Sequence, residues 1–400
     1  MAATAVTTSS ADRSAEHSIA RDATVRLLDY CRSQDWAGYD PYDGLNSRWF
    51  QAFPILRNRW GRLAFIQGFK RSPINLRPLF AAPRGVNPKG IALATQSLLG
   101  LARLGHSSAA AARVMADRLV SLRTPGWTRA CWGYHFDWQT RTYLVPRGYP
   151  NIICSSFAGE ALLDAFEALG ERRYLDIAAD TGRFILNDLK RTAADDAFCF
   201  SYTPLCPSRV HNASLLGAAL LARLAAATGE REFREAAEGA ARYGIRHQRD
   251  DGSWIYGEDA NQGWIDSFHT GYNLLALRAL AKHLDLPEAA ASVERGYRFY
   301  RQHFFPGKGV VKYFHDRTYP IDTHAVAHAI LTLSEFADRD PTALEEAGRI
   351  IRWALEHMRS PEGWFYYQKW PLWTNRLNYM RWSQAWMLLA LTQYLEATRG

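Results

Sequence analysis

The chain has 400 residues, of which 48% are hydrophobic, so it is long enough to bury a large core. Its formal net charge is +8, with Arg scattered along the chain and no evident block of like charges. No basic helix or recognition motif points to nucleic-acid binding, and no apolar run reaches the roughly 18 residues of a membrane span. The charge excess indicates a solvated basic surface or, alternatively, an acidic partner such as a uronic-acid glycan.

The cysteines and the N-terminus predict a cytoplasmic protein. Five cysteines form neither a CxxC pair nor a zinc spacing, and we expect them to be reduced and buried. The first 20 residues are rich in Ala, Ser and Thr and lack the apolar segment of a signal peptide. We therefore expect residues 1–18 to form a disordered tail. Nothing in the sequence demands a cofactor.

The first elements of the chain precede its regular part. Apolar residues at helical spacing predict a helix over residues 19–34. A stretch rich in turn residues and acids follows, over residues 36–47. Residues 48–80 mix several Arg and Trp and predict a helix with irregular structure. We expect residues 36–88 as a whole to form an irregular cover over a barrel mouth.

From Pro88 onward a two-helix pattern repeats. An apolar helix is followed by an amphipathic helix and then by an aromatic turn. The predicted pairs cover 91–104 with 107–123, 153–169 with 172–189, 213–228 with 231–248, 268–283 with 288–303, and 324–336 with 342–358. A last apolar helix, 382–398, lacks a following partner, which the N-terminal helix can supply.

Six apolar and six amphipathic helices predict an all-α fold, an (α/α)₆ toroid of six helical hairpins. Apolar helices are buried and amphipathic helices lie outside them. Because the first helix completes the last pair, a closed ring is favoured over an open solenoid, and residues 19–400 form a single domain. The connectors are expected to be short aromatic-rich hairpins. Turns such as Gly252-Ser253-Trp254 resemble the structural repeats of triterpene cyclases.

Parallel inner helices bring their N-termini, with unpaired N–H groups and partial positive charge, to one end of the toroid. The polar residues at these helix starts should therefore surround one funnel, where carboxylates can act as acid and base and aromatic rings can stack on sugars. The predicted catalytic residues are Asp266, Asp322, His269, His324, Tyr379 and Arg381. The predicted substrate-binding residues are His211, Asn212, Trp254, Trp264, Tyr272, Trp382, Asp40 and Asp43.

Simpler interpretations compete at several of these positions. Asp266 and Asp322 each precede a helix and are good N-cap residues, and Asn212 is also a plausible cap. His324 and His328 lie one helical turn apart, but without a third ligand nearby we predict no metal site. Asp40 and Asp43 also suit a turn.

Several stretches together resemble the VpsJ-type polysaccharide biosynthesis proteins of exopolysaccharide loci, many of which carry the label aminolevulinate dehydratase. The resemblance implies an α/α toroid and a glycan context, and the fold resembles six-hairpin glycosidases and uronate lyases. It carries no catalytic assignment. The matching stretches are residues 39–47, 210–213, 264–272, 319–324 and 379–386.

The leading hypothesis is a carbohydrate-active, glycosidase-like enzyme that acts on a polysaccharide or a lipid-linked oligosaccharide. Hydrolysis would use Asp266 and Asp322 as its carboxylate pair. Uronate elimination or epimerisation would instead use His or Tyr as the base, with Arg381 neutralising the substrate carboxylate. A terpenoid cyclase, with Asp195-Asp196 or Asp250-Asp251 as its acidic motif, and a non-catalytic glycan-binding protein are the alternatives from other classes.

Overall fold

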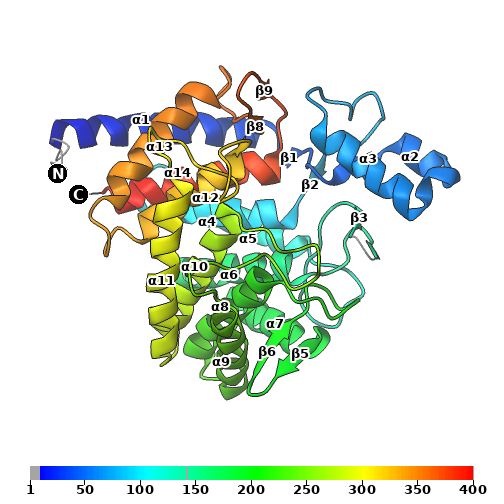
Figure 1. The fold of residues 1–400 in the computed structure, drawn as a ribbon, viewed down its shortest axis with the longest axis vertical. Helices are drawn as coiled ribbons and strands as arrows, with labels where there is room; N and C mark the ends of the chain where they lie inside the picture. Colours follow the sequence, from blue (N-terminus) through cyan, green and yellow to red (C-terminus); the bar gives the residue numbers. More distant parts are fainter. Residues whose placement is uncertain (1–9, 141–142, 400) are drawn as a thin grey trace.

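The computed structural model describes residues 10–140 and 143–399, which form a ring of helices with one projecting arm (Figure 1). Neighbouring inner helices contact each other along the chain, and the last inner helix contacts the first. The ring is therefore closed, and the predicted toroid is confirmed. The inner helices are α4 (Pro88–Arg103), α6 (Ile152–Leu169), α8 (His211–Thr228), α10 (Ser267–His283), α12 (Thr323–Glu335) and α14 (Ala385–Ala397).

Each inner helix packs against an outer helix that follows it in sequence, except the last. For α14 the partner is α1, which packs against both α14 and α13. The N-terminal helix thus completes the sixth pair, as the sequence predicts. The outer helices are α1 (Ser10–Ser33), α5 (Ala109–Ser121), α7 (Arg172–Asp188), α9 (Arg231–Arg246), α11 (Pro287–Phe304) and α13 (Ala343–His357).

The first helix begins at Ser10, earlier than the sequence predicts. Glu16 is buried, forms an ion pair with Arg352 on α13, and accepts a hydrogen bond from the Tyr394 hydroxyl at 3.4 Å. These contacts with distant residues stabilise a helical segment that the local composition does not predict. The part of the predicted disordered tail from Ser10 onward is therefore helical, and residues 1–9 lie outside the described residues.

Short antiparallel strands form the connectors. The aromatic turn after α5 is a hairpin, and a three-stranded sheet joins the start of α12 to the last connector. Among the described residues no helix is long and apolar enough to cross a membrane. The strands are β1 (Ala37–Gly38), β2 (Gly85–Val86), β3 (Trp138–Gln139), β4 (Leu144–Val145), β5 (Arg191–Ala194), β6 (Ala197–Phe200), β7 (Ile321–Asp322), β8 (Gln368–Lys369) and β9 (Thr374–Asn375).

Residues 48–84, which we term the arm, stand out from the ring at one side (Figure 1). They contain α2 (Arg48–Ala52), a 3₁₀ turn (Pro54–Arg57) and α3 (Arg59–Arg71). A small core beneath them, separate from the main core, contains Phe50 and Ile66. The segment expected to be a largely irregular cover is thus a small helical projection.

Candidate active site

The starts of four inner helices are fixed by one repeated hydrogen bond. The first helical N–H has no partner within its own helix, and here it donates to a tyrosine carbonyl in the next connector. The repeats are thereby joined to each other, and four tyrosines are brought to one end of the ring. The four bonds run from Ile152 to Tyr202 (3.0 Å), His211 to Tyr256 (3.2 Å), Ser267 to Tyr313 (2.9 Å) and Thr323 to Tyr367 (3.1 Å).

Three of these tyrosines, together with Tyr134 from an earlier connector, line this end, which we term the aromatic mouth. The four residues are Tyr134, Tyr202, Tyr256 and Tyr313. Each keeps part of its surface accessible, although burial raises the pKa of each well above its ordinary value. The four rings are thus only partly covered at this end of the ring. The hydroxyls of Tyr134 and Tyr202 lie 3.0 Å apart, so neighbouring connectors meet here.

Asp266 positions His269 at the start of α10. Its Oδ1 accepts the backbone N–H of His269 at 2.9 Å, which is the predicted N-cap. Its Oδ2 lies 2.7 Å from Nδ1 of His269 and accepts the indole N–H of Trp264 at 3.0 Å. The carboxylate holds the proton on Nδ1, so Nε2 is the basic nitrogen. Nε2 has no hydrogen-bond partner among the described residues, and the side chain is 20% exposed.

Aromatic rings surround this imidazole. Tyr256 stacks on Trp264 with ring centroids 4.5 Å apart and lies 4.6 Å from the His269 ring. The ring centroids of Phe268 and His269 lie 4.1 Å apart. The accessible faces of Tyr256 and Trp264 next to a positioned base resemble the aromatic platforms on which sugar rings stack.

A buried hydrogen-bonded chain lies deeper in the ring. Nζ of Lys89 donates to the Tyr272 hydroxyl at 3.2 Å, and that hydroxyl lies 2.8 Å from Nε2 of His324. Burial lowers the pKa of His324 well below its ordinary value, so the imidazole is neutral and its Nε2 accepts the tyrosine proton. The chain connects α4, α10 and α12, and Tyr272 keeps 4% of its surface accessible.

Lys89 is a buried cation without a carboxylate partner among the described residues. Its Nζ lies 4.2 Å from the centroid of the Phe157 ring and 5.1 Å from that of Trp386. Burial lowers its pKa well below the ordinary value, and the nearby Arg381 adds to this effect. An unpaired buried ammonium costs stability, and groups of this kind concentrate at functional sites.

Asp322 is closed off from any ligand. Its Oδ1 accepts the N–H of His324 at 2.9 Å and the indole N–H of Trp382 at 2.9 Å, while Oδ2 accepts from Gln368 at 2.7 Å. Its side chain is fully buried, and burial raises the pKa of this carboxyl to about 6. The structure therefore shows Asp322 as the N-cap of α12 and as the group that fixes Trp382.

Arg381 and Asp40 form a buried ion pair. Nε and Nη2 of Arg381 donate to the two carboxylate oxygens at 2.6 and 2.8 Å, and the arginine side chain is 4% exposed. It sits on a π-helical turn (Met380–Gln384) before α14, a distortion common at functional sites. Because Asp40 already balances this charge, only Nη1 remains without a partner among the described residues.

Asp43 and Tyr379 lie beneath the arm rather than at the mouth. Asp43 accepts from Nε of Arg77 at 2.6 Å, and the Arg77 guanidinium covers the Tyr379 ring at 4.8 Å. All three side chains are fully buried. The structure thus places these two candidates in a structural network that attaches the arm.

Two further candidates, His211 and Trp254, also do not lie at the aromatic mouth. His211 faces the outer helix α9, where its ring lies 5.2 Å from His247, and burial lowers its pKa to about 4. Trp254 is 2% exposed and donates to the Gly244 carbonyl at 2.9 Å. Asn212 is not a cap, because Val210 holds that position, but its Oδ1 is buried without a partner.

The sequence interpretation missed the residues that the connectors supply. Tyr134 and Tyr202 come from connectors that were not among the predicted site segments, and Phe157 and Trp386 are inner-helix residues that resemble ordinary core. Tyr134, Tyr202 and Tyr256 stand 18, 9 and 11 residues before the inner helices that follow them, so no common spacing pointed to them. Within the described ranges no group of three or more His, Cys, Asp or Glu could hold a metal ion.

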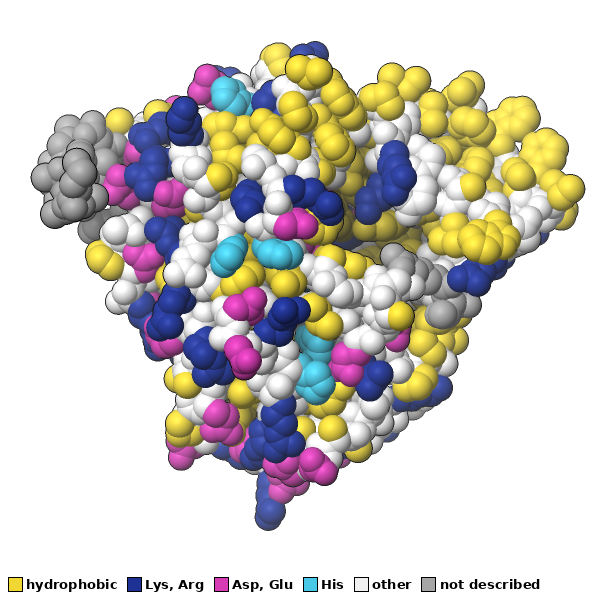
Figure 2. All heavy atoms as spheres, viewed as in Figure 1, with side chains coloured by type: hydrophobic (Ala, Val, Ile, Leu, Met, Phe, Trp, Pro, Cys, Tyr) yellow, Lys and Arg dark blue, Asp and Glu magenta, His cyan; other side chains and the backbone are white. Residues whose placement is uncertain are grey.

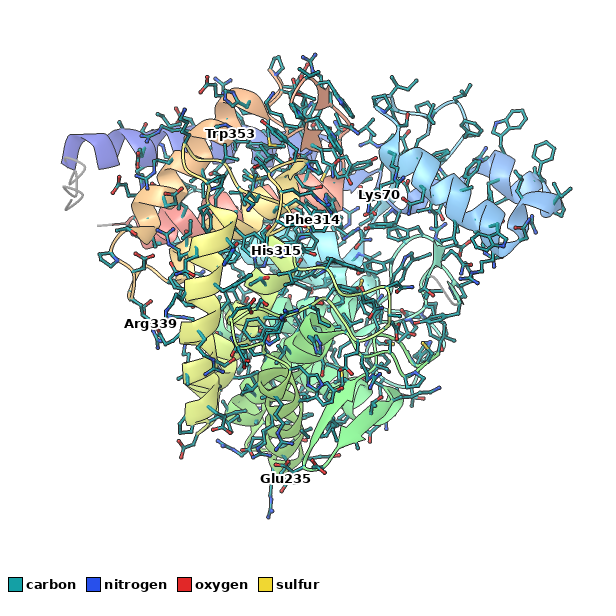
Figure 3. The ribbon with its side chains drawn as sticks, in the orientation of Figure 1. Lys70, Glu235, Phe314, His315, Arg339 and Trp353 are labelled. Atoms are coloured by element: carbon teal, nitrogen blue, oxygen red, sulfur yellow. The ribbon has the colours of Figure 1, made fainter. Side chains whose placement is uncertain are left out.

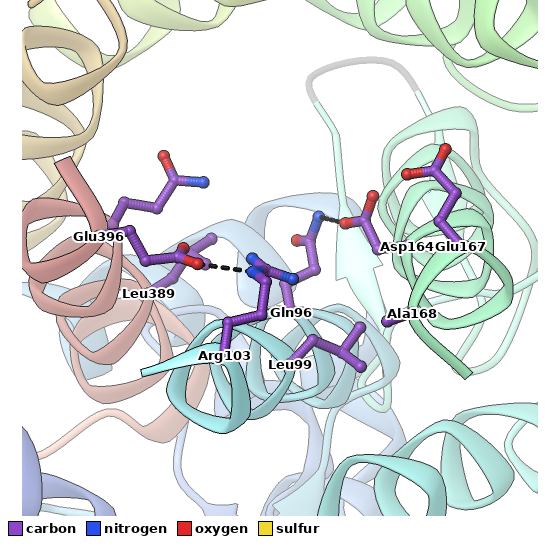
Figure 4. A pocket seen from close by; sticks show the side chains of 9 residues that line it. Gln96, Leu99, Arg103, Asp164, Glu167, Ala168, Leu389 and Glu396 are labelled. Carbon is purple, nitrogen blue, oxygen red and sulfur yellow. Dashed lines mark hydrogen bonds and ion pairs between the residues drawn. The ribbon is translucent and has the colours of Figure 1, made fainter. Parts of the chain in front are cut away.

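The opposite end of the ring carries a separate cavity of about 400 Å³ (Figure 4). It is lined by residues near the C-terminal ends of α4, α6 and α14. Arg103 pairs with Glu396 at 2.7 Å, and Gln96 donates to Asp164 at 2.7 Å. These polar groups already satisfy one another, so the cavity adds no reactive group to the mouth.

The acidic pairs that a terpenoid cyclase would need are surface features. Asp196 forms an ion pair with Arg246 at 2.5 Å, and its side chain is 58% exposed. Asp251 accepts from the backbone N–H of Ser253 within a turn at 2.9 Å. Neither faces the interior of the ring.

No protein family model matches the sequence, and no curated protein matches it. Solved structures share its fold. A cellobiose 2-epimerase from Spirochaeta thermophila has a TM-score of 0.57 at 15% identity, covering 78% of this chain and 88% of that one. An unsaturated glucuronyl hydrolase specific for heparin has a TM-score of 0.60 at 12% identity, covering 95% and 97%. A GH76 α-mannanase from Bacteroides thetaiotaomicron has a TM-score of 0.59 at 14% identity, covering 78% and 86%. The chain is thus an α/α toroid of the kind found in these proteins.

Proposed function

We propose that this protein is a carbohydrate-processing enzyme that moves a proton at a sugar carbon, in an epimerisation or an elimination, with His269 as the base. The observation that carries the proposal is the Asp266–His269 pair. It presents a free, partly exposed Nε2 beside the stacked rings of Tyr256 and Trp264.

The occupied carboxylates support proton transfer over hydrolysis. Every oxygen of Asp266 and Asp322 already accepts a hydrogen bond, from its own helix start, from an indole or from Gln368. Hydrolysis requires one carboxyl that protonates the leaving group and one that activates water or attacks the sugar. Two buried caps lack the freedom for either role.

In the proposed first step, Nε2 of His269 takes a proton from a carbon next to a carbonyl or carboxyl group. The electron pair of that C–H bond moves onto the oxygen, where negative charge develops. The convergent helix N-termini and the Lys89 ammonium supply positive potential for this charge. Return of the proton to the other face completes an epimerisation, whereas loss of the β-substituent completes an elimination.

The substrate class follows from the mouth and from the motif resemblance. Aromatic walls suit pyranose faces, and the resemblance to polysaccharide biosynthesis proteins favours a glycan of exopolysaccharide synthesis, made in the cytoplasm. Because Asp40 already neutralises Arg381, we assign Arg381 to positioning and do not require it to bind a uronate carboxylate. An acidic or neutral sugar remains compatible with the site.

The test is incubation with a panel of acidic and neutral glycans in D₂O. Solvent deuterium uptake, unsaturated-uronate absorbance and new reducing ends are followed together. Deuterium in recovered sugar supports epimerisation, and absorbance supports elimination. Both should be lost in His269→Gln and retained in His303→Gln, which alters a histidine on outer helix α11. New reducing ends without exchange or absorbance would refute the proposal.

A further inference from the structure

The arm exposes large apolar side chains that a solvated surface does not require. The exposed fraction reaches 82% for Ile55, 73% for Trp60 and 71% for Leu79. Figure 2 shows hydrophobic atoms concentrated over the projecting arm, in contrast to the mixed surface of the ring below it. An apolar patch of this kind marks an interaction site. Its other members are Trp49, Phe53 and Ile74.

The patch continues onto the hairpin of β8 and β9. Leu372 and Trp373 at its tip are 96% and 41% exposed, and Trp373 stacks on Trp370 at 5.8 Å. Asn375, on β9, donates to the Ser72 carbonyl in the arm at 3.2 Å. Two segments about 300 residues apart in sequence are thus joined by a hydrogen bond, and both present apolar tips to solvent.

The positive charge of the chain is concentrated in this arm. The whole sequence has 48 Lys and Arg and 40 Asp and Glu; residues 48–84 hold eight of the former and none of the latter, which leaves 40 against 40 elsewhere. The description of Arg as scattered without a block of like charges is therefore wrong. The arm alone accounts for the net charge of +8.

Seven of the eight cations of the arm have no carboxylate partner among the described residues. Of the eight, Arg77 alone has a carboxylate partner among the described residues, the buried Asp43. Arg62 bonds to Gln139 at 2.6 Å, and Lys70 bonds to the Tyr42 hydroxyl at 2.9 Å where the arm meets the ring (Figure 3). The remaining charges are free for an anionic partner.

We propose that the arm docks this protein on the surface of an anionic lipid bilayer. Trp, Phe, Ile and Leu insert at the headgroup boundary, while Arg and Lys approach the lipid phosphates; this is the composition of interfacial membrane segments. A second copy of the chain fits less well, because two identical basic arms repel each other. The inference is independent of the proposed chemistry, although docking beside the mouth would suit a lipid-linked glycan.

The test uses the full chain with vesicles of phosphatidylcholine and about 30% phosphatidylglycerol, compared with phosphatidylcholine alone, in a sedimentation assay. We expect binding to the anionic vesicles, weakened by salt. Removing one surface cation should lower the affinity about 5-fold, so Arg59→Gln with Arg71→Gln lowers it roughly 30-fold. Ile55→Ser with Trp60→Ser should lower it at least about 10-fold.

Matched controls keep the test specific. Val114→Ser replaces a side chain that is 67% exposed on α5, and Arg231→Gln replaces one that is 88% exposed on α9; both should bind like the parent protein. Equal binding to neutral vesicles, or no binding to either kind, would overturn the proposal. So would a dimer, detected by light scattering, that the Ile55 and Trp60 substitutions dissociate without affecting vesicle binding.

Discussion

The ring and the arm use the same residue types in opposite ways. In the ring, many arginines are paired: Arg223 contacts three carboxylates, and Arg278 contacts Glu335 and Asp338. Most of its large apolar residues are buried. In the arm, the surface arginines have no carboxylate partners and the large apolar residues face outward. A feature that the fold does not need, and that costs solubility, is a candidate for function.

The same contrast separates two roles. Proton transfer is proposed at the mouth, where a positioned imidazole and an unpaired buried lysine lie, and membrane docking is proposed for the arm. If the roles are separate, substitutions in one region should leave the property of the other unchanged.

The largest expected effect is at His269. Replacing this base by Gln should lower turnover about 10²- to 10⁴-fold, the usual contribution of a general base, while vesicle binding stays at the parental level. Steady-state kinetics and sedimentation on the same preparation check both. An active His269→Gln variant would remove the imidazole from the mechanism.

The joint at the base of the arm, where Arg77 donates to the Asp40 carbonyl and Asp40 pairs with Arg381, should be the most sensitive to substitution. Asp40→Ala leaves the buried Arg381 guanidinium without its partner, and we expect a loss of about 3–5 kcal/mol in the free energy of unfolding. Denaturant titration measures it. The exposed ion pair of Arg231 and Glu235 provides the control, since Glu235→Ala should cost less than about 1 kcal/mol. Equal costs for both would contradict a buried joint.

Asp322 should make the free energy of unfolding depend on pH in the way expected of a buried carboxyl group. Its pKa is raised from 3.8 to about 6, so the folded state retains the proton over that interval. Its contribution to stability is present below pH 3.8 and is lost as the pH rises through about 6. The stability of the parent relative to Asp322→Asn should therefore fall from pH 4 to pH 7, by on the order of 2 kcal/mol.

The exposed Asp196 is the control for this measurement. The hydrogen bond from Arg246 lowers its pKa, so its contribution to stability is present at neutral pH and is lost on acidification. Asp196→Asn should shift the pH profile in the opposite direction. A flat profile for Asp322→Asn would show that this carboxyl is charged in the folded protein at all pH values tested.

The smallest expected effect is a gain in stability at Lys89. Its pKa is lowered by burial, so Lys89→Met removes a poorly accommodated charge and should raise the free energy of unfolding by about 1 kcal/mol at neutral pH. Turnover should fall, because the donor to Tyr272 is lost. Because the folded pKa is depressed, the gain should shrink as the pH rises. Thermal unfolding and kinetics test this, and a destabilised variant with full activity would mean that Lys89 is structural.

The helices were predictable because their pattern is local. Apolar residues at helical spacing fixed eleven of the twelve ring helices to within about three residues at each end, and the unpaired last helix indicated closure. The start of α1 was missed because Glu16 is held by Arg352 and Tyr394, which are far away in sequence. The N-cap roles of Asp266 and Asp322 were also predictable from the residues that follow them.

Which residues make up the site could not be predicted in the same way. Whether a residue at a helix start faces the mouth depends on side-chain direction and on neighbouring repeats. His211 and His269 occupy similar places in their helices, yet the first faces α9 and the second is held by Asp266 at the mouth. The pairing of Arg381 with Asp40 spans most of the chain and has no local signal.

The sequence by itself determined the number of ring helices and their alternation of buried and outer faces. Each of these depends on residue type and on spacing within a short stretch. The tertiary structure decided which polar groups neutralise each other and which remain free, because that depends on contacts between repeats. Lys89 and the surface cations of the arm have no carboxylate partner among the described residues, and in this they differ from the paired arginines of the ring.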